Sequence, residues 1–167
     1  MGKSAVPTGF NSARSEHLLQ EQVHDAYKSK GKLPEPTTCP QCGAVFHEGR
    51  WQWLQAPAGA HQETCPACHR IHDDYPAGFV TLQGEFFHTN RDEIMHLVHN
   101  VEKRERAEHP LQRIMAVEET KNKGALVCTT DPHLARSIGE ALHHAYRGSL
   151  RFHYNHEENL LRVNWVR

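Results

Sequence analysis

The sequence predicts an α+β fold made of four parts in chain order: a tail, a small four-cysteine ribbon, a linking helix and a β-β-α-β-β domain. Two paired-cysteine motifs indicate the ribbon, and a helical apolar repeat between alternating segments indicates the last domain. We expect the tail at residues 1–38, the ribbon at 39–88, the helix at 89–110 and the last domain at 111–167.

The ribbon is predicted from two Cys-x-x-Cys motifs, one at Cys39 and Cys42 and one at Cys65 and Cys68, which 22 residues separate. Each motif directs two sulfurs to one side of a turn, and four thiolates at about 2.3 Å form a closed tetrahedral site for Zn²⁺. We therefore expect one structural Zn²⁺ held by all four cysteines. So small a module has little core of its own, so its fold should depend on the ion.

Two other uses of these cysteines compete with zinc. His69 follows Cys68, so the second motif matches the attachment signature of c-type haem, and either pair could be a redox dithiol. The chain opens with Met-Gly-Lys-Ser-Ala, without the apolar segment that would export it to a haem-attaching compartment. Neither motif is followed by the helical apolar period of a thioredoxin-like site. We favour zinc, and interpret the fifth cysteine, Cys128, as a small buried apolar residue.

The charge and composition of the chain limit the kinds of partner that it can bind. The chain has 19 Lys and Arg against 20 Asp and Glu, so any nucleic-acid surface must be local. Cysteines in a metal pattern, with no signal peptide and no long apolar stretch, predict a cytoplasmic protein without a membrane span. The 15 histidines are unusually many. They could bind metal, respond to pH or contact RNA, and composition alone does not distinguish these three roles.

The tail has few large apolar residues and ends in a basic run. We expect it to be disordered alone, with a partly helical stretch over residues 13–28 that folds against a partner. In the ribbon, β-prone runs at 44–46 and 50–54 lie between the motifs. Two further runs, at 79–82 and 85–87, flank Gln83-Gly84 and predict a hairpin.

The linking helix is predicted to begin at Asn90, because acidic residues and a helical apolar repeat follow it. His109-Pro110 should end it, and the mixed charges of 102–108 are interpreted as a solvated face. In the last domain, segments at 111–120, 125–130, 150–155 and 161–165 predict four strands. Between them, Asp131-Pro132 predicts a helix start, since Asp is a favoured N-cap and Pro suits the first helical position.

Cations and aromatic residues gather at the end of the tail, beside the cysteine motifs, and on the last helix with its adjoining hairpin. Because cations pair with phosphates and rings stack on bases, we interpret these groups as candidate RNA contacts. They are Lys28, Lys30, Lys32, Arg50, Trp51, Arg70, Arg136, His143, His144, Arg147, Arg151 and Arg162. The alternatives are a solvated helix face and tryptophans that only cover the zinc. No P-loop motif is present, so we expect no nucleotide cofactor.

A second, catalytic metal is a further alternative. Asp92, His96 and His99 share one face of the linking helix, but the chain contains no His-Glu-x-x-His motif. It also contains no Gly-x-Ser-x-Gly nucleophile elbow. We therefore expect a protein that is not an enzyme, and keep a metal-dependent hydrolase as an alternative.

Several segments together resemble an uncharacterised bacterial zinc-ribbon family, and they span nearly the whole chain after residue 30. They are residues 31–36, 39–47, 49–53, 65–71, 75–78, 109–111 and 129–136. The paired cysteines and the Tyr-Pro-x-Gly segment are also similar to the N-terminal zinc region of the archaeal and eukaryotic adaptor that escorts the large ribosomal subunit to export. That similarity implies docking on ribosomal RNA and brings no catalytic residues.

These observations lead to one hypothesis and one main alternative. We expect a zinc-ribbon protein that binds structured RNA, with ribosomal RNA and the ribosome as partners and a role in assembly, quality control or hibernation (dormancy). The alternative is a protein-interaction adaptor. The two differ in salt dependence, because several phosphate contacts make binding fall steeply with salt, whereas an adaptor's binding would be nearly independent of it.

Overall fold

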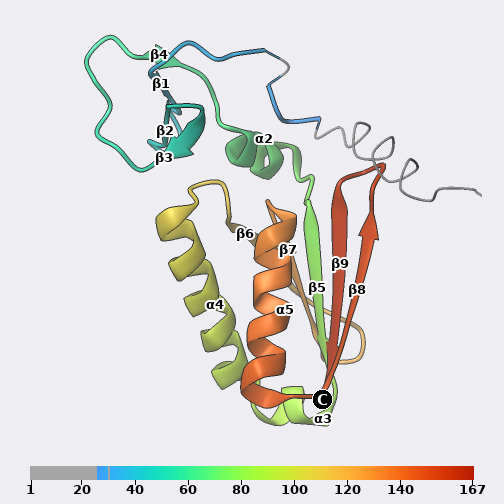
Figure 1. The fold of residues 1–167 in the computed structure, drawn as a ribbon. Coiled ribbons are helices and arrows are strands. Elements are labelled where there is room, and N and C mark those ends of the chain that lie inside the picture. The colour runs from blue at the N-terminus through green and yellow to red at the C-terminus, as the bar shows by residue number, and fades with distance from the viewer. Residues whose placement is uncertain (1–25, 30) are drawn as a thin grey trace, which may run out of the picture.

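The computed structural model describes residues 26–29 and 31–167, so most of the predicted tail, including Lys30, lies outside the described residues. The described chain has a mixed α/β fold with four helices and two sheets (Figure 1). The smaller sheet has the strand order β3-β2-β1-β4, and the larger one β6-β7-β5-β9-β8. The smaller sheet and the short helix α2 stand at one end of the larger sheet.

The smaller sheet carries the cysteine motifs. Its strands are β1 (Thr37–Thr38), β2 (Val45–His47), β3 (Arg50–Gln52) and β4 (His61–Gln62). The first motif forms the turn between β1 and β2, and the second begins α2 (Pro66–Asp73). Cys65 is the N-cap of α2, because its sulfur accepts a hydrogen bond from the N–H of Cys68, and Pro66 takes the first helical position.

The prediction of a hairpin around Gly84 is wrong. Residues before Gly84 form β5 (Gly78–Gln83) as predicted, but those after it form the short helix α3 (Glu85–Thr89). The N–H groups of Phe86 and Phe87 donate to the carbonyl of Arg167, at 2.9 and 3.3 Å, so the end of the chain satisfies them instead of a partner strand. β5 pairs antiparallel with β7 and parallel with β9, which places this strand in the middle of the larger sheet.

The β-β-α-β-β order predicted after residue 111 is confirmed. The elements are β6 (Ile114–Glu119), β7 (Ala125–Thr129), α5 (Pro132–Tyr146), β8 (Ser149–Asn155) and β9 (Leu160–Val166). Asp131 caps α5 as expected, its carboxylate accepting the N–H of His133 at 2.7 Å. α4 (Arg91–Glu108) and α5 cover one face of the larger sheet, and the main apolar core lies between them and the strands.

Close packing fixes α5 on the sheet. A Cβ at Gly139 would lie 2.6 Å from Cγ1 of Val163 in β9, so only glycine lets the helix approach this strand so closely. Asn90 precedes α4 as predicted, but its side-chain amide donates to the carbonyl of Phe86 at 2.9 Å instead of capping α4. Of the helices in the described chain, none has both the length and the apolar character needed to cross a bilayer.

Candidate metal centre

The four predicted ligands converge. The sulfurs of Cys39, Cys42, Cys65 and Cys68 all lie within 4.8 Å of one another, and three of the four residues are buried. The sulfurs of Cys42 and Cys65 are 3.8 Å apart. A tetrahedron with metal–sulfur bonds of about 2.3 Å has edges of about 3.8 Å, whereas a disulfide needs about 2.05 Å. All four are free cysteines, and together they can hold one metal ion.

Backbone hydrogen bonds hold the two motifs in this arrangement. The N–H of Gly43 donates to the carbonyl of Cys39 at 2.9 Å, and Gly43 has a φ of +80°, which closes the first turn and favours glycine. The N–H of Cys65 donates to the sulfur of Cys39 at 3.3 Å, so the second motif is bonded directly to the first. Trp51 and Leu111 pack against this cluster and shield it, which confirms the covering role considered for Trp51.

Arg113 is a neighbour of the cluster that the sequence analysis did not identify. Its two terminal nitrogens donate to three of the four sulfurs: Cys42 at 3.2 Å, Cys65 at 3.3 Å and Cys68 at 3.3 Å. Its Nε donates to the carbonyl of Pro110 at 2.8 Å, and the residue is only 5% exposed. A buried arginine with every contact made to sulfur or carbonyl is a cation built to face thiolates.

The charges agree with this geometry. The hydrogen bond with Cys65 lowers the pKa of Cys42 to about 4, while the same contact raises the pKa of Cys65. Burial raises the pKa of Cys68. Burial would lower the pKa of Arg113, but its hydrogen bond to Cys68 and the charges of Cys42 and Cys65 raise it overall, so it stays a cation. Four thiolates around a divalent ion carry a net charge of −2, and Arg113 offsets half of it.

The segment that carries Arg113 is held by the larger sheet. Thr130, which follows β7, donates its hydroxyl to the carbonyl of Leu111 at 2.6 Å and accepts the N–H of Arg113 at 2.9 Å. The N–H of Thr130 donates to the carbonyl of Arg113 at 2.9 Å. These bonds press residues 109–113, which connect α4 to β6, against the cysteine cluster. The metal centre is therefore completed by Arg113, a residue that hydrogen bonds to Thr130 hold beside the larger sheet.

The second metal site considered from the sequence does not form. Asp92, His96 and His99 lie exposed on α4, and His99 pairs with Glu102 at 3.9 Å. Within residues 26–29 and 31–167, the four cysteines form the one group of three or more His, Cys, Asp or Glu side chains close enough to share an ion. The geometry therefore gives no support to a hydrolytic site on α4.

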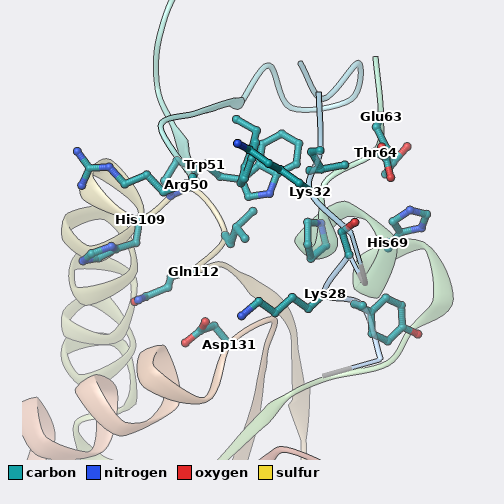
Figure 2. Close-up of a pocket in the computed structure, with 18 of the residues that line it drawn as sticks. Lys28, Lys32, Arg50, Trp51, Glu63, Thr64, His69, His109, Gln112 and Asp131 are labelled. Atoms are coloured by element: carbon teal, nitrogen blue, oxygen red, sulfur yellow. The ribbon is translucent and has the colours of Figure 1, made fainter. Parts of the chain in front are cut away.

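A cavity of about 500 Å³ lies beside the cysteine cluster (Figure 2). It is enclosed by the smaller sheet, by residues 109–113 and by the described residues that precede β1, 26–29 and 31–36, which we call the N-terminal segment. We call it the Trp51 pocket, because the Trp51 ring contributes both to its wall and to the cover of the cysteines. Its lining is Tyr27, Lys28, Ser29, Gly31, Lys32, Leu33, Phe46, Gly49, Arg50, Trp51, Glu63, Thr64, Pro66, His69, His109, Pro110, Leu111, Gln112 and Asp131.

The Trp51 pocket brings together four of the predicted RNA contacts, Lys28, Lys32, Arg50 and Trp51. Lys28 and Lys32 come from the N-terminal segment, and Arg50 and Trp51 come from β3. Three cations therefore reach one cavity from two parts of the chain that are separate in sequence. Lys30, predicted with them, lies outside the described residues.

Arg70 is placed differently from the prediction. It is 3% exposed, and its guanidinium donates to the carbonyl of Tyr75 at 3.1 Å. The same group lies over the rings of Tyr27, at 4.6 Å, and Tyr75, at 5.7 Å. Arg70 therefore ties α2 to the N-terminal segment, and it does not present its charge to a phosphate at the surface.

The candidates on α5 lie away from the pocket. The pocket reaches α5 only at its N-cap, Asp131, whereas His143, His144 and Arg147 are at the opposite end of a 15-residue helix. That length corresponds to about 20 Å. Arg136 is exposed nearer the start of α5, but it does not line the pocket.

The candidates on the last hairpin face away from α5. Arg162 alternates with Val163, which is buried beneath the helix, so Arg162 points from the uncovered face of the sheet. Arg151 is paired with Asn164 on that same face, and Arg162 lies over the ring of Phe79 at 4.8 Å. The single surface expected over helix and hairpin is therefore divided between opposite faces of the larger sheet.

Compared with models of protein families, with curated proteins and with solved structures, the chain gives no significant match. The site must therefore be interpreted from its own geometry. Arg113 is the residue of the metal centre that the sequence patterns did not indicate. One signal in the sequence pointed to such a residue: a site of four thiolates needs a compensating cation. The spacing of residues along the chain does not say which arginine supplies it.

Proposed function

We propose that this protein binds one Zn²⁺ through its four clustered cysteines and binds structured RNA at the Trp51 pocket. Zinc is the ion we assign, because four thiolates in a tetrahedron are a donor set that Zn²⁺ favours. The RNA assignment rests on Lys28, Lys32 and Arg50, which line different sides of one cavity that also contains the indole ring of Trp51.

The chemistry of the pocket suits a nucleic acid chain. Lysine and arginine pair with phosphate oxygens, and aromatic rings stack on unpaired bases. The chain as a whole has a formal net charge of −1, so attraction to RNA must come from a local group of cations such as this one. We propose ribosomal RNA as the partner, in line with the implication of the sequence resemblance, and the ion as a structural support for the pocket wall.

The test is binding of the zinc-loaded full chain to a structured ribosomal RNA fragment, followed by fluorescence anisotropy between about 50 and 200 mM salt. Three phosphate contacts predict a loss of affinity of about twentyfold to fortyfold over this range. Lys32→Glu with Arg50→Glu should weaken binding by about tenfold or more. Lys103→Glu with Lys121→Glu makes the same charge change at exposed positions outside the pocket, and should have only a small effect.

Two results would overturn the proposal: no binding of RNA, or equal loss of binding in the pocket pair and the control pair. A pull-down from lysate with and without RNase separates the remaining alternative. Recovery of ribosomal RNA that RNase abolishes supports the proposal, whereas a protein partner retained after RNase and at high salt supports an interaction adaptor.

A further inference from the structure

The larger sheet ends on one side at β8, and this edge is poorly protected against further strand pairing. Among the strands of the described chain, only β9 pairs with β8, along an unbroken ladder from Ser149 to Asn155 (Figure 1). β8 contains no proline, no acidic residue and no bulge. Its outer side therefore presents backbone N–H and C=O groups that no described strand takes up, in a form that another strand can join.

The opposite edge, β6, is protected in two ways. Its ladder with β7 shifts register between Ile114 and Ala116, and the strand ends in two exposed acids, Glu118 and Glu119. Bulges and charged side chains are devices by which proteins prevent edge strands from pairing. This difference indicates that β8, and not β6, is the edge available to a partner.

An apolar ring lies at the middle of the β8 edge. Phe152 is the central residue of the strand, and it is 40% exposed. It is paired with Val163, which is buried beneath α5, so the Phe152 side chain lies on the face of the sheet that α5 covers. Arg136 of α5 lies over the ring at 5.1 Å. The ring is therefore held in place at the edge of the sheet with much of its surface uncovered.

The residue order of β8 makes the strand complementary to itself. When two copies pair antiparallel around a two-fold axis at Phe152, each Phe152 meets the Phe152 of the second copy, and Leu150 meets Tyr154. Aromatic and apolar side chains directly opposite each other stabilise antiparallel strands. On the other face of the sheet Arg151 lies opposite His153, whose ring nitrogen can accept a hydrogen bond from a guanidinium.

The charges at the ends of β8 are complementary in the same register. Arg147 lies two residues before β8 and Glu157 lies two residues after it, and both are exposed. Antiparallel pairing centred on Phe152 brings Arg147 of each copy beside Glu157 of the other, because the two positions are equally distant from the axis. A two-fold interface therefore contains this pair of opposite charges twice.

The helices leave room for this arrangement. α5 packs on β9, where the close approach at Gly139 places it against Val163, and β8 lies one strand further out. In a continuous sheet the two β9 strands are three strand spacings apart, about 14 Å. This separation exceeds the spacing of about 8–10 Å between packed helices. The two α5 helices therefore do not collide, and the Phe152 rings lie in the trough between them.

We propose that β8 pairs with β8 of a second copy of this chain, which gives a two-fold dimer with one continuous sheet built from five strands of each copy. Because the two β8 strands are antiparallel, the two cysteine clusters stand at opposite ends of that sheet. No residue of β8 lines the Trp51 pocket, so the inference goes beyond the proposed function and does not depend on it.

The first experiment is analytical ultracentrifugation of the zinc-loaded full chain over a range of protein concentrations, which should show a reversible monomer–dimer equilibrium. Phe152→Lys places two lysines directly opposite each other and should weaken the dimer by about tenfold or more. Val117→Lys introduces the same side chain on the β6 edge, at a position that is 41% exposed, and should leave the equilibrium unchanged. The melting temperature of each variant reports whether it folds.

Disulfide cross-linking tests the register without a disruptive charge. In Phe152→Cys the two introduced cysteines face each other across the axis with an α-carbon separation of about 4.5–5.5 Å, which permits a disulfide. Mild oxidation of the zinc-loaded chain should therefore give a covalent dimer. His153→Cys, where the two copies are displaced along the strands, and Val117→Cys, on the other edge, should cross-link much more slowly.

A charge exchange tests the ends of the interface. Arg147→Glu places two acids together in each pair and should weaken the dimer by about threefold or more. Addition of Glu157→Arg to the same chain restores opposite charges and should restore the dimer. A loss of association that the second substitution does not reverse would contradict this register.

A monomer at every concentration, or an equal effect of Phe152→Lys and Val117→Lys on association, would overturn the inference. So would a Phe152→Cys chain that cross-links in lysate to a different protein and never to itself, because the edge would then belong to another partner. None of these outcomes bears on the proposed function, whose failure would appear in the salt-dependent RNA assay alone.

Discussion

The guanidinium of Arg113 donates to the sulfur of Cys42 across 3.2 Å, although 71 positions separate the two residues in the chain. Through this contact the cysteine cluster and the larger sheet form one hydrogen-bonded unit. Arg113 stands just before β6, and Thr130 after β7 holds its backbone. The metal centre should therefore depend on the larger sheet as well as on its own two motifs.

Replacement of Arg113 tests this dependence. Arg113→Met keeps much of the side-chain volume but removes the cation, and breaking a buried charge contact costs roughly 3–5 kcal/mol. Chemical denaturation of the metal-loaded protein should show this loss, and a chelator should remove the metal faster. Arg104→Met, at an exposed position on α4, should change stability by less than about 1 kcal/mol. Equal stability of the two variants would contradict the role of Arg113.

Metal removal should affect the two sheets unequally. The smaller sheet has short strands, and the cysteine cluster is its main buried group, whereas the larger sheet has its own apolar core. Elemental analysis should give one zinc per chain. After chelation, or in Cys65→Ser, amide hydrogens of residues 37–73 should exchange much faster while those of β5 and β9 remain protected. Uniform loss of protection would show that the sheets unfold together.

The remaining cysteine, Cys128 in β7, should be inert in the folded protein. Burial, with the nearby charges of Glu118 and Asp74, raises the pKa of this thiol from its ordinary value of 9.0 to about 11. At pH 8 it is protonated and covered, so iodoacetamide should label it only after unfolding. Because the folded pKa is raised, the associated stabilisation is complete below pH 9 and should decline as the pH rises toward 11. Rapid labelling of Cys128 in the folded, metal-loaded chain would refute this.

Packing of α5 on β9 gives a prediction for the fold. Gly139→Val places a branched side chain where even a Cβ would lie 2.6 Å from Val163, so we expect a loss of about 1–3 kcal/mol by thermal or chemical unfolding. Ala145→Val introduces the same side chain at an exposed position of the same helix, and should cost about 0.5 kcal/mol through helix propensity alone. Similar losses of stability in both variants would show that the close contact with Val163 does not exclude a larger side chain at position 139.

Local patterns predicted much of this structure. The Cys-x-x-Cys spacing indicated the cluster, because each motif fixes two sulfurs by short-range turn geometry. Asp131-Pro132 and the alternating segments around it indicated α5 and its neighbouring strands, since N-caps and strand alternation are also local signals. The mixed α/β class and the order of elements after residue 111 follow from these signals.

Features set by distant contacts were not predictable in the same way. β5 looked like half of a hairpin, because its true neighbours β7 and β9 come much later in the chain. The backbone N–H groups at the start of α3 donate to the carbonyl of Arg167, and no local sequence pattern reveals this contact. Arg113 and Gln112 follow Leu111 in an ordinary strand-like run, and only the folded chain shows that one faces sulfurs and the other a cavity.

The contact between Arg113 and the sulfurs also determines how this protein can be divided. A fragment that ends before residue 111 keeps the four clustered cysteines yet loses the Arg113 cation and the covering side chain of Leu111, so its sulfurs would be left open to water on one side. The cysteine segment is therefore a poor candidate for transplantation into another protein. Attempts to dissect the chain into separately expressed pieces should leave residues 37–130 uncut.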